Sequence, residues 1–222
     1  MSLALVYRGF YKRNGIKGNN FNIQIFKNHL DSIKSLGIKN IDIYFHTYSV
    51  NYDEDKKLLS IFKNYNLKKY VFEKEIREKI SYSMIKSLEL VNNKYDLIIN
   101  TRFDVYFIKN LSDWSIKINK LNLAFKDIKK FWDTQKKVSD LIYIFPYKYK
   151  NILISALDKS NNLTPCISGH FIYNYLNINE NEINFMIDGF FSSNTDIQSN
   201  NYIKIFRTNS TNKILRALKM LR

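Results

Sequence analysis

An arginine and an aspartate, Arg102 and Asp104, interrupt the apolar stretch LIINTRFDVYF at residues 97–107. A carboxylate at the end of a buried strand is the kind of oxygen ligand that Mg²⁺ and Mn²⁺ prefer, often together with substrate phosphate oxygens. The planar guanidinium of Arg102 offers a fork of donors that suits a diphosphate. The alternative is an Arg–Asp ion pair that only closes the strand, and for this spacing taken alone the ion pair is the commoner outcome.

The first half of the chain alternates strands with helices. Strands are predicted at residues 3–7, 40–50, 68–73 and 95–107, and helices at 21–37, 53–65 and 75–92. Asp53 is the expected N-terminal cap of the second helix. This alternation predicts a mostly parallel sheet flanked by helices, with right-handed crossovers.

Polar residues fall at the carboxyl ends of three of these strands, and ligands bind beyond such ends in open α/β sheets. They are Arg8, Gly9, Thr47, Tyr48, Arg102 and Asp104. We expect them to converge on one edge of the sheet, which is stronger evidence for a site than any single motif. The glycine-containing segment GIKGNN (15–20) lacks the spacing of a phosphate-binding loop or of a dinucleotide fingerprint.

The second half is less regular. Strands are predicted at 120–127, 139–146, 184–191 and 202–208, and helices at 148–159 and 169–177. Because no segment rich in Pro, Gly and Ser separates the halves and no repeat of fixed period is present, we expect one domain over residues 1–222.

The formal net charge of +15 predicts attraction to an anionic partner such as a nucleic acid, a nucleotide or an acidic membrane. The abundance of Lys, Asn and Ile beside only 6 Gly and 2 Pro is also what AT-rich coding sequence yields, so a plain lysine surface is an equal alternative. No apolar run is long enough to cross a membrane, and no signal peptide is expected. The lone Cys166 excludes a disulfide framework and a cysteine zinc site, so we expect a cytoplasmic, reducing location.

Four segments together resemble the small GT-A glycosyltransferases found in polysaccharide gene clusters and in large DNA viruses. They are YRGF (7–10), IDIYFHTYS (41–49), YDLIINTRFDVYF (95–107) and SDLIYIFP (139–146), and the tail at 191–207 agrees with them. Each segment alone is a weak signal, but their order covers nearly the whole chain. The resemblance implies an α/β three-layer sandwich of the GT-A, Rossmann-like type, with a mostly parallel central sheet and mixed strands from the second half. Residues 1–107 would then bind the nucleotide-sugar, and residues 108–222 the acceptor.

The function implied by this resemblance is sugar transfer, as a hexosyltransferase, from a nucleoside diphosphate sugar, expected to be UDP-linked, to a glycan acceptor in polysaccharide biosynthesis. The family uses a D-x-D element to bind Mn²⁺ or Mg²⁺ and the donor, whereas here Arg102 replaces the first acidic residue and only Asp104 remains. The resemblance implies Asp104 as the metal ligand and Arg102 as a partial substitute for cationic charge near the phosphates. It places Arg8 and Gly9 beside the nucleotide, and Thr47 and Tyr48 around the base or ribose.

An inverting transfer needs a carboxylate base facing the anomeric carbon from the side opposite the diphosphate, so we expect it in the second half of the chain. Asp140 is predicted ahead of Asp133. Asp140 could instead be a turn or cap residue, and Asp133 could lie in an acceptor loop with Trp132 as a sugar-stacking platform. A retaining reaction without a protein base is the remaining alternative.

Other polar residues are expected to be structural or weaker candidates. His29, His46 and His170 are interpreted as structural histidines, and Arg207, Asn194, Thr195 and Asp196 as weak phosphate- or acceptor-site candidates. The tail NKILRALKMLR (212–222) predicts a basic amphipathic helix that either packs on the domain or contacts an anionic membrane.

A second function class, a basic nucleic-acid-binding module without catalytic activity, is suggested by the charge and the many aromatic residues. The sequence contains no RNP-like aromatic motif, zinc module or convincing helix-turn-helix, so we expect no nucleic-acid partner.

Overall fold

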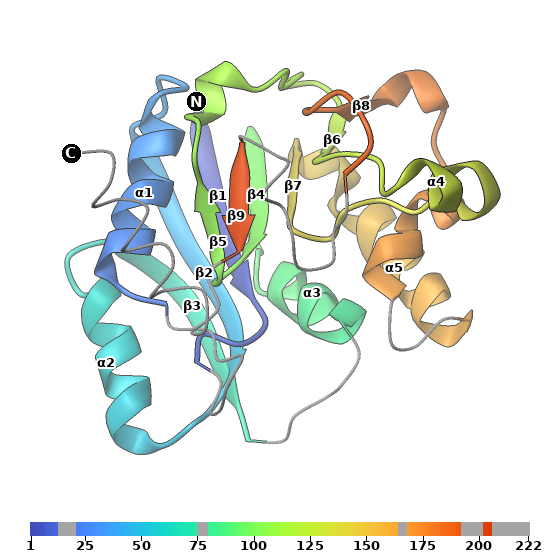
Figure 1. Cartoon of the computed structure of the whole chain (residues 1–222). Helices are drawn as coiled ribbons and strands as arrows, with labels where there is room; N and C mark the ends of the chain where they lie inside the picture. The colour runs from blue at the N-terminus through green and yellow to red at the C-terminus, as the bar shows by residue number, and fades with distance from the viewer. Residues whose placement is uncertain (13–20, 75–79, 164–167, 192–201, 206–222) are drawn as a thin grey trace, which may run out of the picture.

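The computed structural model describes residues 1–12, 21–74, 80–163, 168–191 and 202–205 (Figure 1). Its helices are α1 (Ile23–Lys34), α2 (Tyr52–Phe62), α3 (Ile80–Glu89), α4 (Lys129–Gln135) and α5 (Lys150–Leu163), with 3-10 segments η1 (Leu111–Asp113), η2 (Tyr147–Tyr149), η3 (Ser168–Tyr175) and η4 (Glu180–Glu182). Its strands are β1 (Ser2–Arg8), β2 (Asn40–Tyr48), β3 (Asn66–Glu73), β4 (Leu97–Arg102), β5 (Val105–Phe107), β6 (Leu121–Leu123), β7 (Ile142–Phe145), β8 (Ile183–Phe185) and β9 (Ile203–Ile205).

The central sheet has the strand order β3-β2-β1-β4-β7-β6-β8. β1 pairs in parallel with β2 and β4, β2 with β3, and β6 with β8, while β7 is antiparallel to both β4 and β6. Among the described strands of this sheet, β7 is therefore the one that runs opposite to the others. The predicted α/β sandwich, with a mostly parallel sheet and mixed strands from the second half, is confirmed.

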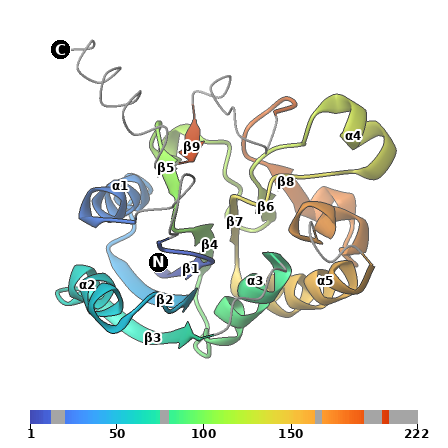
Figure 2. The same cartoon turned by 60° about the horizontal axis from the view of Figure 1, so that its bottom comes forward.

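Alternation along β1 explains the three layers. Leu3, Leu5 and Tyr7 belong to an apolar cluster with α1 and α2, whereas Ala4 and Val6 belong to a second cluster with α3 and α5. Successive side chains of a strand point to opposite faces, so a strand covered on both faces is apolar at nearly every position. Figure 2 shows α1 and α2 on one side of the sheet, with α3 and α5 on the other.

The predicted strand at 95–107 is wrong in being continuous. A turn at Phe103 and Asp104 separates β4 from β5, and β5 leaves the central sheet to pair antiparallel with β9. Phe103 is buried with its ring stacked on that of Tyr7, 4.9 Å between centroids. The turn thus buries Phe103 on the α1 and α2 side of the sheet, within one residue of both Arg102 and Asp104.

Three further expectations differ from the structure. Asn51, not Asp53, caps α2, because its side chain accepts a hydrogen bond from the amide of Glu54 at 2.9 Å. The predicted helix at 169–177 is the 3-10 segment η3. The predicted loop around Asp133 contains the helix α4, which lies far from α1 and α2 across the molecule (Figure 1).

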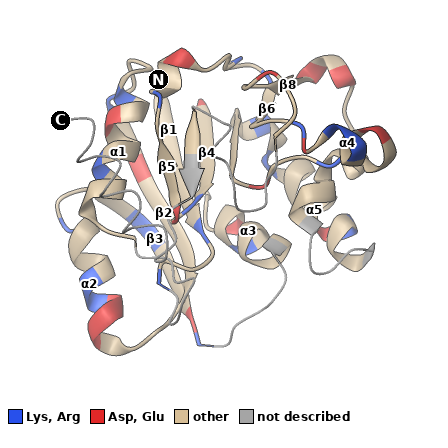
Figure 3. Ribbon diagram, viewed as in Figure 1, with Lys and Arg blue, Asp and Glu red and all other residues tan. Residues whose placement is uncertain are grey.

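The ribbon of Figure 3 shows Lys and Arg positions, in blue, on α1, α2, α4 and α5. In the described part of the chain, no helix combines the length and apolarity needed to cross a bilayer.

Several predictions lie outside the described residues. They concern Cys166, Asn194, Thr195, Asp196, Arg207 and the basic helix at 212–222.

Candidate functional site

The strand register brings two arginines side by side at the carboxyl edge of the sheet. Arg8 pairs with Arg102 across β1 and β4, and with His46 across β1 and β2. Because β7 is antiparallel to β4 and pairs Ile142 with Thr101, the residues just before β7 reach the same edge. Asp140 arrives there by this route. We call Arg8, Arg102, Asp104, Asp140 and His170 the Arg–Asp cluster.

Arg102 holds the two carboxylates of this cluster. Its Nε donates to Asp104 Oδ1 at 2.8 Å and its Nη2 to Asp104 Oδ2 at 2.6 Å, which is a two-pronged pair. Its Nη1 lies 3.4 Å from Asp140 Oδ2. These contacts use three of the five N–H groups of the guanidinium.

The exposure of these groups differs. The side chains of Asp104 and Asp140 are 1% and 2% exposed, whereas that of Arg102 is 19% exposed. Burial lowers the pKa of Arg102, but the charges of Asp104 and Asp140 outweigh it and raise the pKa overall, so Arg102 stays a cation. Of these three charged side chains, Arg102 is therefore the one that solvent or a ligand can reach.

Arg8 is the second cation and is buried, with 2% of its surface exposed. Its Nε donates to Asn100 Oδ1 at 2.9 Å and its Nη2 donates to the backbone carbonyl of Asp140. Asn100 in turn donates to Ser87 Oγ at 3.0 Å. Burial lowers the pKa of Arg8, and the nearby Asp140 carboxylate opposes this shift. The sequence reading missed Asn100 and Ser87, although a polar residue inside the apolar run LIIN is a detectable signal.

Asp140 lies between the cations and a histidine. Its Oδ1 is 3.7 Å from Nε2 of His170, whose Nδ1 lies 3.0 Å from the carbonyl of Val138. Burial raises the pKa of Asp140, but His170, Arg102 and Arg8 outweigh it and hold this pKa well below its usual range. The carboxylate is therefore ionised at neutral pH and is a weak base.

Gly9, Thr47 and Tyr48 lie beside this cluster, Gly9 just after the end of β1 and the other two at the end of β2. Gly9 has φ +83°, a conformation that favours glycine. Its amide donates to Ser83 Oγ at 2.7 Å, and Thr47 Oγ1 donates to its carbonyl at 2.8 Å. Tyr48 is 3% exposed and its ring lies 4.8 Å from that of Phe10. The contact between Thr47 and Gly9 joins the ends of β1 and β2. A role for Thr47 and Tyr48 in lining a base or ribose pocket stays a prediction.

The structure does not bring Asp133 to the Arg–Asp cluster. Asp133 is exposed on α4, and Trp132 beside it is buried with its ring 5.0 Å from Tyr173 and 5.4 Å from Phe185. The predicted sugar-stacking platform is thus a packed core residue.

His29 and His46 are buried as expected, His29 between Tyr7 and Val105 and His46 at 3.2 Å from Glu73.

The described side chains do not fit the predicted divalent ion at Asp104 as they lie. Both oxygens of Asp104 accept hydrogen bonds from Arg102, and the neighbouring carboxylate of Asp140 contacts the same guanidinium. No group of three His, Cys, Asp or Glu residues within the described ranges could hold a metal ion. The side chains at Asp104 therefore do not support a chemical step through a metal.

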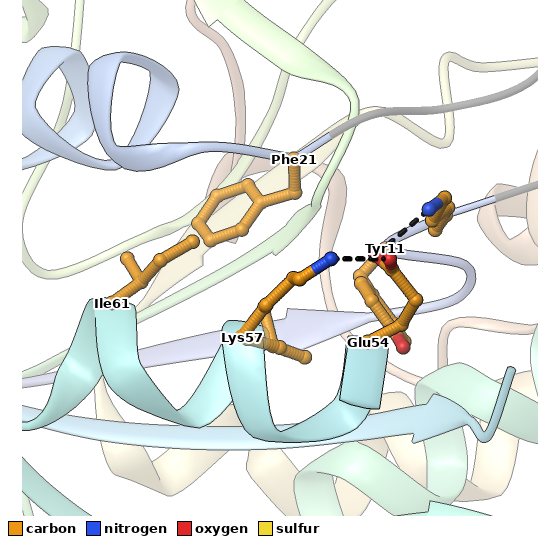
Figure 4. Close-up of a pocket in the computed structure, with 7 residues that line it drawn as sticks. Tyr11, Phe21, Glu54, Lys57 and Ile61 are labelled. Atoms are coloured by element: carbon orange, nitrogen blue, oxygen red, sulfur yellow. Dashed lines mark hydrogen bonds and ion pairs between the residues drawn. The ribbon is translucent and has the colours of Figure 1, made fainter. Parts of the chain in front are cut away.

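A small open cavity of about 110 Å³ lies beside α2 (Figure 4). Lys12 and Lys57 both contact Glu54, at 2.7 and 2.9 Å, and Phe21 and Ile61 supply apolar lining. Pockets for drug-sized ligands measure roughly 300–1,000 Å³, so this cavity admits a small group and not a whole nucleotide-sugar.

No protein-family model and no curated protein sequence matches the chain. Among solved structures, 4-diphosphocytidyl-2C-methyl-D-erythritol synthase from Anaerococcus prevotii has a TM-score of 0.51 at 11% identity, with 100% of this chain and 96% of that chain covered. The glycosyltransferase GlyE of Streptococcus pneumoniae has a TM-score of 0.48 at 12% identity, with 85% of this chain and 46% of GlyE covered.

A mannosyltransferase from Pyrobaculum calidifontis, solved with GDP-Man and Mn²⁺, has a TM-score of 0.41 at 11% identity, with 67% of this chain and 45% of that chain covered. The chain thus spans less than half the length of GlyE and of this mannosyltransferase. At such identities a likeness shows the fold alone, which is an α/β sandwich similar to that of the Anaerococcus synthase.

Proposed function

We propose that this protein is a glycosyltransferase that moves a sugar from a nucleoside diphosphate sugar to a glycan acceptor. The observation that carries the proposal is the partly exposed cation Arg102, held with the buried Arg8 at the carboxyl edge of the sheet. Ligands of α/β sheets bind at this edge, and a diphosphate is an anion that guanidinium groups recognise well. A UDP-linked hexose as the donor is the expectation from the sequence.

In this proposal the chain's own residues bind and orient the donor. Arg102 donates its remaining N–H groups to the diphosphate, and Asp104 fixes the plane of the guanidinium through its two-pronged contact. The acceptor oxygen forms a bond to the anomeric carbon, the bond from that carbon to the diphosphate oxygen breaks, and the nucleoside diphosphate leaves. The fixed positive charge stabilises the negative charge that grows on the leaving diphosphate.

The proton of the acceptor hydroxyl needs a destination if the reaction inverts the anomeric centre. Asp140 stays the predicted base, with Asp133 as the alternative. The ion pairs and the low pKa of Asp140 favour a second role for this residue, which is to position Arg102 and His170. Asp133 would act only on an acceptor bound at the exposed face of α4.

A thermal-shift screen tests the proposed function. UDP, GDP and CDP, each with EDTA or with Mn²⁺, are compared with a single-stranded oligonucleotide at moderate salt. We expect a nucleoside diphosphate to raise the melting temperature, since a ligand that binds only the folded state stabilises it. Arg8→Ala should lose this shift, whereas Lys148→Ala should keep it, because Lys148 is exposed and follows the end of β7 at the opposite edge of the sheet.

Two outcomes would replace this proposal. Stabilisation by the oligonucleotide alone would favour the nucleic-acid-binding module suggested by the net charge of +15. Stabilisation by a nucleoside triphosphate together with a sugar phosphate, but not by any nucleoside diphosphate, would favour nucleotidyl transfer instead. The Anaerococcus synthase, whose fold is similar, is the reason to include that arm.

A further inference from the structure

We propose that Arg102 takes the electrostatic place of a divalent ion, so that this protein binds the diphosphate of its donor without a metal. The inference rests on the proposed function and concerns the same edge of the sheet. It starts from the disagreement between the ion expected at Asp104 and the side chains that surround that carboxylate.

The carboxylate of Asp104 is occupied on both oxygens. Arg102 Nε and Nη2 approach them at 2.8 and 2.6 Å, and the side chain of Asp104 is 1% exposed. An ion that used Asp104 as a ligand would have to displace this buried, charge-assisted pair. It would also lie within a few ångströms of the Arg102 cation, which repels it.

The charges of the cluster balance without an ion. Arg8 and Arg102 carry two positive charges, and Asp104 and Asp140 carry two negative charges. A divalent ion held by two carboxylates gives the same sum. An acidic residue at position 102 would carry one negative charge where Arg102 carries one positive charge, and this difference of two charges equals the charge of a divalent ion.

The direction of Arg102 suits this task. Its contacts use three of its five N–H groups, and 19% of its side chain is exposed while both carboxylates are covered. A phosphate at this edge of the sheet can therefore reach the partly exposed guanidinium, whereas the carboxylates are covered. Since Asp104 and Asp140 hold the guanidinium from two sides, the cation is preorganised and needs little reorientation.

Titration calorimetry with UDP and GDP, in EDTA and in Mn²⁺, tests the inference on the unmodified protein. We expect the dissociation constant of the nucleoside diphosphate that binds to agree within about twofold between the two buffers, since no ion takes part in the recognition. If the nucleotide binds in Mn²⁺ and not in EDTA, the inference is overturned while the proposed function survives. If no nucleoside diphosphate binds in either buffer, the proposed function fails too.

The variant Arg102→Asp tests the opposite case, in which nucleotide binding should come to depend on a metal ion. The carboxylate introduced by this substitution and that of the native Asp104 would stand two residues apart, so we expect weak nucleotide binding in EDTA and recovery of about tenfold or more in Mn²⁺. Electron paramagnetic resonance of Mn²⁺ should show the ion bound to the variant and not to the unmodified protein. Mn²⁺ bound tightly by the unmodified protein would contradict the inference without any measurement of activity.

Arg102→Ala tests the loss of the cation, but it leaves the buried carboxylates without the Arg102 charge. A double variant, Arg102→Gln with Asp104→Asn, is therefore measured beside it, because it removes both charges of the Arg102–Asp104 pair. Either variant, once shown to fold by circular dichroism, should bind nucleotide about tenfold or more weakly in EDTA. Lys148→Ala is the control for loss of one positive charge elsewhere. Unchanged affinity in the folded double variant would overturn the inference.

Discussion

Two buried polar clusters begin at adjacent residues of β1 and differ in every other respect. Tyr7 points toward α1, where its hydroxyl lies 2.8 Å from Nδ1 of His29, and His29 Nε2 lies 2.7 Å from the carbonyl of Val105. Arg8 points the other way and belongs to the Arg–Asp cluster. We call the first group, Tyr7, His29 and Val105, the Tyr7–His29 cluster.

The Tyr7–His29 cluster is neutral and closed. Because a carbonyl only accepts, Nε2 of His29 carries the proton and Nδ1 accepts from the Tyr7 hydroxyl. Burial raises the pKa of Tyr7 and lowers the pKa of His29 to about 4, so both stay uncharged at neutral pH. Every donor here has its acceptor, which is what a structural cluster needs and what leaves it no capacity for a ligand.

The Arg–Asp cluster, in contrast, holds four formal charges and keeps one of them partly exposed. Burial of a charge lowers the stability of the fold unless the charge is paired, and apolar residues of similar volume often give equal or greater stability than a buried ion pair. Burial of polar groups alone therefore does not mark a site, and the partly exposed charge of Arg102 is the feature on which the proposed function rests.

The largest expected effect is that of Asp140→Ala. The variant leaves Arg8 and Arg102 with one carboxylate between them, and removing one partner of a buried ion pair costs about 3–5 kcal/mol of the free energy of unfolding. Urea denaturation followed by circular dichroism measures it. A loss near zero would show that the ion pairs of the Arg–Asp cluster contribute no more to the free energy of unfolding than the contacts of the neutral Tyr7–His29 cluster.

Asp140→Asn separates the two roles of that residue, because it keeps the shape and the backbone contact to Arg8. If Asp140 is the base, donor binding is retained and the rate of transfer falls steeply, since an amide cannot accept the proton. Reduced donor binding in step with the rate would assign Asp140 to positioning Arg102. Asp133→Asn, measured beside it, tests the alternative base.

The pH dependence of stability tests the Tyr7–His29 cluster. The pKa of His29 is about 4 in the folded protein and about 6.5 when unfolded, so the unfolded chain binds the proton first as the pH falls. Stability is full above pH ~6.5, and about 3 kcal/mol is lost on going down to pH ~4. Urea titrations at pH 7.5 and pH 5 measure this slope, which should be shallower in His29→Gln. An equal slope in the two proteins would mean that the pKa of His29 is the same in the folded and the unfolded protein.

A smaller effect is expected for Arg8→Ala on donor binding. Loss of the buried positive charge beside Arg102 should weaken binding of the diphosphate by ~1.5–3 kcal/mol, as read by calorimetry with the nucleotide that stabilises the protein. Affinity equal to that of the unmodified protein would assign Arg8 to the fold alone, through Asn100 and the carbonyl of Asp140.

The smallest effect is expected for Tyr7→Phe. The variant keeps the ring packed on Phe103 and removes one hydroxyl, so about 1 kcal/mol of stability is lost with the hydrogen bond to His29. Nucleotide binding should not change, because Tyr7 faces away from Arg8. A weakened affinity in this variant would mean that the two clusters are coupled through β1.

Much of the fold was predictable because its signals are local. Apolar runs gave the strands of the first half, and helical spacing gave α1, α2 and the described part of α3. The 3-10 geometry of η3 and the helix α4 were missed, since short segments are decided by the packing of residues such as Trp132 on Tyr173 and Phe185. The break at Phe103 was missed for a similar reason, because β5 is drawn away by pairing with β9, which is distant in sequence.

From the sequence alone, Arg8, Thr47 and Arg102 are expected at one edge of the sheet, because parallel strands linked by helices point the same way. The groups that these residues contact at that edge follow from the folded arrangement of the strands. β7 runs antiparallel to β4, so its amino end and Asp140 reach the carboxyl end of β4, and the turn at Phe103 lets Asp104 fold back onto Arg102. A strand's direction depends on pairing between residues such as Thr101 and Ile142, about 40 positions apart, and no local pattern of side chains encodes it.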